Sequence, residues 1–109
     1  MTEESQCLVL CTCPDQATAR QLAESLVTKQ LAACVNIISG MESIYRWQGN
    51  IEHDQELLLL IKTRRQAVTA LSREIQALHP YELPEVIAVP IMAGLEPYLQ
   101  WIENNVVTQ

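Results

Sequence analysis

The chain has 109 residues, of which 49% are hydrophobic and 18% are charged, so it suits one globular domain with a packed core. Thirteen acidic residues against seven Lys and Arg give a net charge of −6, which argues against nucleic acid and membrane surfaces as partners. The apolar run at residues 57–61 is far too short to span a membrane, and residues 1–4 do not begin a signal peptide. We therefore expect a single domain over residues 1–109, located in the cytoplasm.

The first predicted elements are a strand and a helix. Residues 6–13 are rich in residues that favour strands, and they end at Pro14. Asp15 then suits the N-cap of a helix. Apolar side chains follow at the spacing of one helix face: Ala19, Leu22, Ala23, Leu26, Val27 and Leu31.

A long, bent second strand and a central third strand are predicted next. Residues 34–38 and 42–48 read as extended structure, with a bulge or bend at Ser39-Gly40 between them. Gly49-Asn50 is a dipeptide typical of hairpin turns. The returning strand includes residues 57–61, which are apolar on both faces and therefore belong in the centre of a sheet.

The last predicted elements are a helix, a strand and a short helix. Thr63 and Gln66 have the spacing of a capping box, which predicts a helix that begins there and ends before Pro80. The apolar stripe of this helix consists of Val68, Leu71, Ile75 and Leu78. Residues 85–92 read as a strand whose Pro90 favours a sheet edge, and Pro97 suits the first turn of a C-terminal helix.

This order of elements predicts an α+β fold of the split βαβ type. The pattern β-α-β-β-α-β gives an antiparallel sheet with two helices on one face, here with an added C-terminal helix. The first and third strands are expected in the middle of the sheet. The long second strand then forms an exposed edge, and pairing such an edge with another copy of the chain is one way to protect it.

Three of the four cysteines lie on the first predicted strand. Cys7, Cys11 and Cys13 share the parity of one strand face, and extended backbone holds them too far apart for comfortable disulfides. Their spacing is not C-x-x-C, so neither a thioredoxin-like nor a zinc-ribbon motif is present. We expect reduced thiols.

Six segments together point to a known family. They are LCTCPD at residues 10–15, LAACVN at 31–36, SIYRWQG at 43–49, LIKT at 60–63, HPYELPE at 79–85 and YLQW at 98–101. In order and spacing they resemble the CutA family of divalent-cation tolerance proteins over nearly the whole chain. The resemblance implies one CutA-like domain with a ferredoxin-like fold, assembled as a tight homotrimer shaped like the PII signalling proteins. It implies a role in tolerance to copper and other divalent metals, and no established reaction.

The resemblance nominates Cys11 and His79 as metal ligands, for copper or another divalent ion, and implies no organic cofactor. Thiolate and imidazole ligands suit copper and zinc. Alternatively, Cys11 is a small apolar group in a buried strand, and His79 is a cation at a helix C-terminus. Cys13 lies one side-chain step from Cys11, so a two-thiolate Cu(I) site is a further alternative. Some relatives have two histidines where this chain has Leu78-His79, so one candidate ligand is missing.

Lys62, Trp47, Tyr81 and Glu85 are candidates for a cleft that binds an effector. Lys62 ends the central strand just before a predicted helix start, which would suit a small anionic effector. The alternative is that Lys62 pairs with Glu85 or lies along the sheet edge. Trp47 and Tyr81 have polar tips on apolar rings, which suits packing between subunits as well as ligand binding.

Three classes of function compete at this point. The first is a non-enzymatic homotrimer that binds a metal ion or a small effector in clefts between subunits, with a PII-like signalling or protein-anchoring scaffold as its variant. The second is a small enzyme, for which the only candidate constellation is a convergence of Lys62, His79 and Glu85. The third is an RNA-binding module, which the absence of a basic, aromatic strand motif argues against. The sequence favours the first.

Overall fold

The computed structural model describes residues 5–107. Within them the elements follow the order β1 (Gln6–Cys13), α1 (Gln16–Thr28), β2 (Cys34–Trp47), β3 (Asn50–Arg64), a 3-10 turn η1 (Arg65–Ala67), α2 (Val68–Leu78), β4 (Ile87–Pro90) and α3 (Glu96–Asn104). The strands form one antiparallel sheet in the order β2-β3-β1-β4. This confirms the predicted α+β fold, with the first and third strands in the middle.

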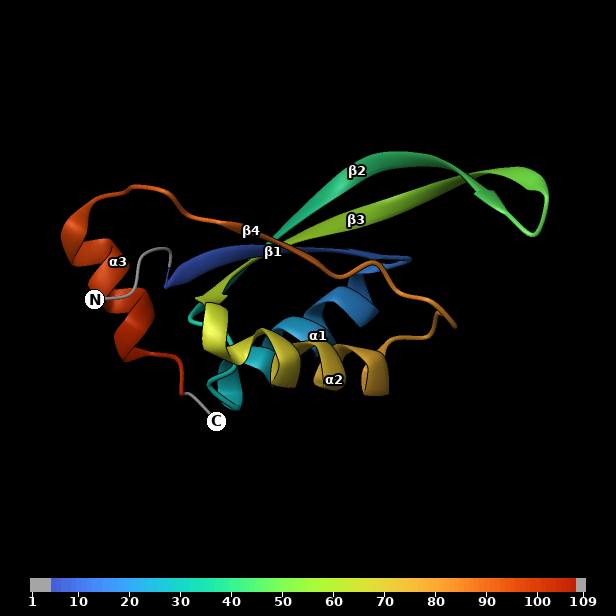
Figure 1. The fold of residues 1–109 in the computed structure, drawn as a ribbon. Helices are drawn as coiled ribbons and strands as arrows, with labels where there is room; N and C mark the ends of the chain where they lie inside the picture. Colours follow the sequence, from blue (N-terminus) through green and yellow to red (C-terminus); the bar gives the residue numbers. More distant parts are fainter. Residues whose placement is uncertain (1–4, 108–109) are drawn as a thin grey trace.

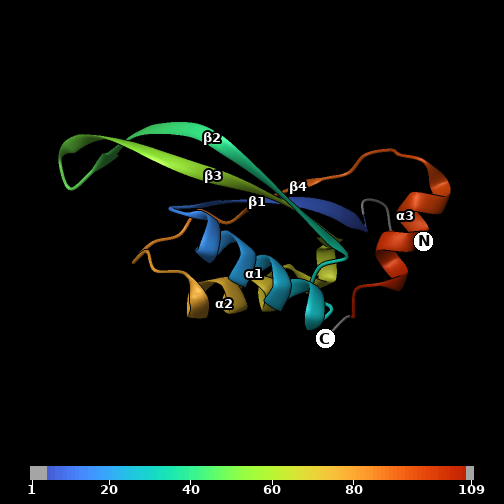
Figure 2. The same ribbon diagram turned by 180° about the vertical axis from the view of Figure 1, so that it is seen from behind.

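The core lies between the sheet and two helices. Helices α1 and α2 lie side by side on one face of the sheet, and α3 lies at the end where β1 begins (Figure 1, Figure 2). Alternate residues of β1 and β3 point into this core, because successive side chains of a strand face opposite ways. The fully buried ones include Val9, Cys11, Cys13, Leu59 and Ile61.

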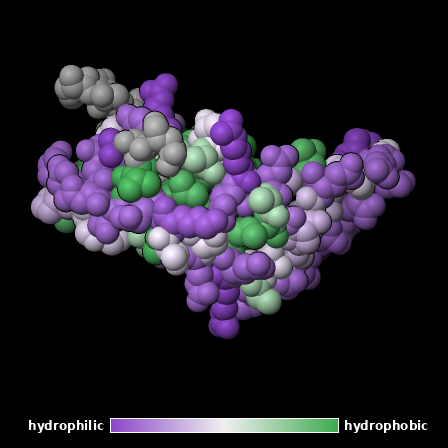
Figure 3. Space-filling model, turned by 90° about the horizontal axis from the view of Figure 1, so that it is seen from below, coloured by the Kyte–Doolittle hydropathy of each residue, from purple (hydrophilic) through white to green (hydrophobic). Residues whose placement is uncertain are grey.

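No helix covers the other face of the sheet within residues 5–107. On that face the partly buried Leu8 and Leu10 of β1 pair with Val89 and Ile87 of β4, which are 43% and 52% exposed. By contrast, the surface on the helix side is mostly hydrophilic (Figure 3). None of the helices in the described part of the chain is long and apolar enough to cross a membrane.

The hairpin of β2 and β3 extends beyond the body of the molecule and gives it a long axis of 46 Å (Figure 1). The predicted bulge is confirmed, since the pairing register shifts between Ile38 and Met41 and Gly40 has a φ of 85°. The predicted turn dipeptide was wrong by one position. The turn residues are Gln48 and Gly49, both with positive φ, and Asn50 already pairs with Trp47. Positive φ at both positions is the type I′ pattern that matches strand twist.

The predicted capping box at Thr63 was wrong. Thr63 is still part of β3, and its fully buried hydroxyl donates a hydrogen bond to the carbonyl oxygen of Leu31 at 2.7 Å. The turn η1 follows, and α2 begins only at Val68, with no side-chain hydrogen bond at its N-cap. The Thr63 hydroxyl therefore hydrogen-bonds to a distant backbone carbonyl and does not cap the helix.

Other local predictions hold with smaller changes. The Asp15 carboxylate accepts a hydrogen bond from the backbone N–H of Thr18 at 2.8 Å, as expected of an N-cap. Helix α1 ends at Thr28, so Leu31 is buried in the loop after it. Strand β4 is shorter than the predicted residues 85–92 but does lie at the sheet edge.

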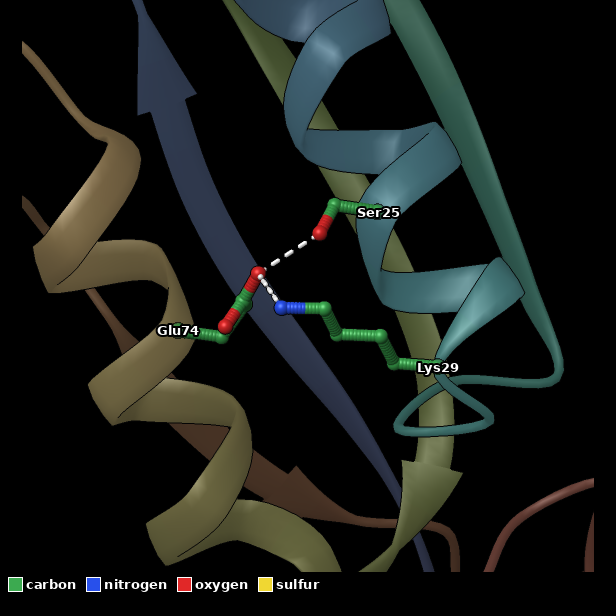
Figure 4. Close-up of polar contacts among 3 residues, drawn as sticks. All are labelled: Ser25, Lys29 and Glu74. Carbon is green, nitrogen blue, oxygen red and sulfur yellow. Dashed lines mark hydrogen bonds and ion pairs between the residues drawn. The ribbon is translucent and has the colours of Figure 1, made fainter.

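A polar cluster connects α1 to α2 (Figure 4). Glu74 of α2 accepts hydrogen bonds from the Ser25 hydroxyl at 2.6 Å and from the Lys29 ammonium at 2.8 Å. The Lys29 contact, followed by that of Ser25, lowers the pKa of Glu74. The Lys29 side chain is 57% exposed, so water screens the pair.

We predict that Glu74→Gln lowers the free energy of unfolding by less than about 1 kcal/mol at neutral pH. Because the folded-state pKa is lowered, the stabilisation is complete above the unfolded pKa of about 4.3 and is lost as pH falls through the folded value. Urea unfolding should therefore show a smaller difference between the wild type and the variant at pH 3 than at pH 7. An equal difference at both pH values, or one unaffected by 1 M salt, would contradict this assignment.

Candidate metal centre

Cys11, Cys13 and His79 converge at one end of the core. The two thiols point inward from the end of β1, and His79 is the first residue after α2. One ligand atom from each residue lies within 4.8 Å of the others. Both cysteines are fully buried, and His79 is 7% exposed. The chain therefore brings the two predicted ligands together without a second subunit, and adds Cys13 to them.

Both ring nitrogens of His79 have partners. Nε2 lies 2.7 Å from the carbonyl oxygen of Thr12, and the backbone N–H of Tyr81 donates to Nδ1 at 3.1 Å. A carbonyl only accepts, so Nε2 carries the proton and the ring is the neutral tautomer. This differs from the alternative of a cation at the helix end. A metal ion at either nitrogen has to displace the partner there, which makes His79 a weaker ligand than a free imidazole.

The two thiols of the centre are coupled. The hydrogen bond between them, reinforced by burial, raises the pKa of Cys11, while the same hydrogen bond lowers the pKa of Cys13. The two thiols are therefore close enough to interact directly. The Cys11 sulfur also lies 3.7 Å from the Thr12 carbonyl oxygen. A soft metal ion bound here would replace the thiol protons of Cys11 and Cys13.

The donor set fits a soft metal ion. Two sulfurs and one imidazole are ligands that copper and zinc accept, whereas magnesium and calcium prefer oxygen. Metal–thiolate bonds of about 2.3 Å let one ion join two sulfurs that are up to about 4.6 Å apart, close to the limit within which these ligand atoms lie. The centre can therefore hold one ion with little movement of β1.

A cleft of about 770 Å³ lies beside this centre, between the hairpin and the segment that follows α2. Three of the four predicted cleft residues line it, namely Trp47, Tyr81 and Glu85. Thr12, which separates the two cysteines in sequence, lines it as well. The lining includes the carboxylates of Glu56, Glu82 and Glu85 and the guanidinium of Arg46. With three negative groups against one positive group, the cleft favours cations.

Lys62 does not line this cleft. It is paired with Leu8 and Cys34 in the sheet, whereas Thr12 is paired with Leu58, four residues away along β3. At about 3.3 Å per residue, the two positions are about 13 Å apart. The Lys62 ammonium donates a hydrogen bond to the Asn36 side chain rather than to Glu85. The constellation of Lys62, His79 and Glu85 considered for an enzyme is not formed.

Glu56 is a cleft residue that the sequence analysis missed. It is only 6% exposed and accepts a hydrogen bond from the Tyr81 hydroxyl at 2.8 Å. Burial and this hydrogen bond raise the pKa of Tyr81. The Tyr81 ring also packs against His79, with ring centroids 4.6 Å apart. Tyr81 thus joins the cleft to the metal centre. The signal for Glu56 was a carboxylate directly before the apolar run of the central strand.

Comparisons with known proteins agree with this fold. Residues 7–105 match the family described as CutA1 divalent ion tolerance protein. The divalent-cation tolerance protein CutA of Thermus thermophilus is 51% identical over 98 residues, which cover 90% of this chain and 95% of that protein. Protein CutA of Homo sapiens is 50% identical over 93 residues, which cover 85% of this chain and 52% of the human protein.

The solved structures show the same relationship. The divalent cation tolerance protein (Cut A1) from Thermus thermophilus superposes on this chain with a TM-score of 0.92 and 49% identity, covering 94% of this chain and 99% of that one. The fold, the family match and the identity to a relative of similar length lead to one conclusion. The chain belongs to the CutA1 divalent ion tolerance family.

Proposed function

We propose that this protein contributes to divalent-cation tolerance by binding copper at Cys11 and His79, as a homotrimer without enzymatic activity. One observation carries the metal assignment: the two residues, 68 positions apart in sequence, have their ligand atoms within 4.8 Å of each other in a single chain. Membership in the family of divalent ion tolerance proteins supports the same role.

The cleft beside the centre supports capture of a cation. Its carboxylates raise the local concentration of positive ions, and Thr12 and Tyr81 connect it to the buried ligands. The charge of the lining favours a cation there over the small anionic effector expected from the position of Lys62.

We propose a cytoplasmic location for the protein, because a reducing compartment keeps thiol ligands free.

The homotrimer is supported by the uncovered face of the sheet. Ile87 and Val89 on that face, and Ile44 and Ile51 on the hairpin, are apolar side chains with 43–62% of their surface exposed. Exposed apolar side chains on both edges of the sheet are the kind of surface that another protein chain can cover. A second copy of the chain is the partner we propose.

The same surface favours a second candidate function, a PII-like signalling or anchoring scaffold that needs the trimer but no metal.

Copper titration of Cys11→Ser and His79→Gln against a competing chelator tests the metal assignment. Loss of a residue that only hydrogen-bonds to a metal ligand costs about 10- to 100-fold in metal affinity. Loss of the Cys11 thiolate, which would bind the metal directly, should therefore cost more than about 100-fold. We expect a smaller loss, about tenfold, for His79→Gln, because that ring must release a hydrogen bond to bind.

Cys7→Ser is the matched control for these titrations. Cys7 is a buried thiol on the same strand and the same face, but it is not part of the cluster of ligand atoms. Its replacement should leave copper affinity unchanged, and circular dichroism should show that each variant is folded. Wild-type affinity in both ligand variants would reject the metal centre and favour the scaffold.

A further inference from the structure

We infer that Cys13 is the second thiolate of this centre and that the ion it holds is Cu(I), bound between the sulfurs of Cys11 and Cys13. This inference rests on the proposed function and gives it a definite ion and ligand set. It depends on a residue that the expected pair of Cys11 and His79 does not include.

The backbone holds the two sulfurs ready for one ion. Cys11 and Cys13 are two positions apart on β1, where they pair with Leu59 and Leu57 of β3, so their side chains leave the same face. Both side chains are fully buried against the helices. Their sulfurs lie within the 4.8 Å limit of the cluster, close to the span of about 4.6 Å that two metal–thiolate bonds allow. Binding therefore requires little ordering of the protein.

The number and kind of donors favour Cu(I) over Zn(II). Thiolates are soft ligands that suit Cu(I), and Cu(I) is stable with two or three of them. A structural zinc ion takes four donors in a tetrahedron, and this cluster provides three. The third donor, His79, is engaged at both nitrogens, so only the two thiols are ready to bind. Two-coordinate Cu(I) needs no more than these.

The binding step conserves charge and needs no redox partner. Copper arrives as Cu(I), two S–H bonds break, two copper–sulfur bonds form and two protons leave to solvent. The product carries one negative charge, less than the two charges of a bare thiolate pair. The cation-favouring cleft lies next to the centre, because Thr12 and Tyr81 line it and both contact the His79 ring.

Anaerobic titration with Cu(I) and a chromophoric Cu(I) chelator, on the full chain, tests the inference. Cys13→Ala should lower Cu(I) affinity by more than about 100-fold, since losing a direct ligand costs more affinity than losing a residue that only hydrogen-bonds to a ligand. Cys7→Ala is the matched control and should bind as the wild type does, because Cys7 is buried on the same face of β1 outside the cluster. Cys13→Ser repeats the test with a side chain closer in size, and thermal unfolding shows that the variants are folded.

X-ray absorption at the copper edge separates this inference from the proposed function. We expect two sulfur neighbours in the wild type and one in Cys13→Ala, and we expect Cu(I) to displace Zn(II) added first. One sulfur neighbour in the wild type, or unchanged affinity in both Cys13 variants, would overturn the inference while leaving the Cys11–His79 centre in place. Wild-type protein that binds no copper at all would reject both.

Discussion

Replacing Val89 by Glu is expected to convert the proposed trimer into single chains of 12.3 kDa. Val89 is 43% exposed on β4, on the sheet face that no helix covers in the described residues, so the folded chain can accommodate a carboxylate there. In the proposed assembly that carboxylate would be buried against another copy without a partner, at a cost of several kcal/mol per chain. Sedimentation velocity at micromolar concentration measures the change directly.

Val27→Glu is the matched control for this experiment. Val27 is the same residue type and is 42% exposed, but it lies on α1, on the helix side of the molecule. It should sediment as the wild type does. If Val89→Glu remained trimeric, or if the two variants dissociated equally, the uncovered sheet face would not be the interface. A wild-type chain that sediments as a monomer would contradict the trimer itself.

Periodicity in the sequence was enough to predict the main elements. The helix stripes of α1 and α2 repeat every three or four residues, and their central members, such as Leu22 and Leu71, are fully buried. The run at residues 57–61 is apolar on both faces, and this placed β3 correctly in the middle of the sheet. These signals are local and strong, so tertiary structure had little to add.

The errors arose where a distant residue decided a local outcome. Thr63 has the spacing of a capping box, but its hydroxyl bonds to Leu31, 32 residues earlier, because β3 continues through this position. Lys62 has the parity of Leu58 and Leu60, which fixes its face of the strand but not its distance from the segment that carries Tyr81. Only the pairing register with neighbouring strands determines that distance.

The candidate centre was predictable in part. The parity of β1 correctly put Cys11 and Cys13 on one face, and a family resemblance named Cys11 and His79. Their convergence depends on how the end of α2 packs against the end of β1, which no local pattern encodes. The hydrogen bonds that engage both nitrogens of His79 come from backbone groups, and these have no sequence signature at all.

The two faces of β3 should respond differently to the same substitution. Leu59 is fully buried under the helices, so Leu59→Ala leaves a cavity inside the chain and should cost about 2–5 kcal/mol. That is a large part of the roughly 5–15 kcal/mol that stabilises an ordinary domain. Leu60, the next residue, is on the uncovered face and is only partly buried in the single chain. Leu60→Ala should therefore weaken association between copies of the chain.

Thermal unfolding followed by circular dichroism at two protein concentrations distinguishes these effects. The loss in the free energy of unfolding for Leu59→Ala should be the same at both concentrations, because the cavity is within one chain. For Leu60→Ala the melting temperature should fall much further in the dilute sample, since coupling of folding to assembly makes stability depend on concentration. If the two variants showed the same dependence on protein concentration, the outer face of β3 would be exposed to water. Association between copies would then not explain why residues 57–61 are apolar on that face.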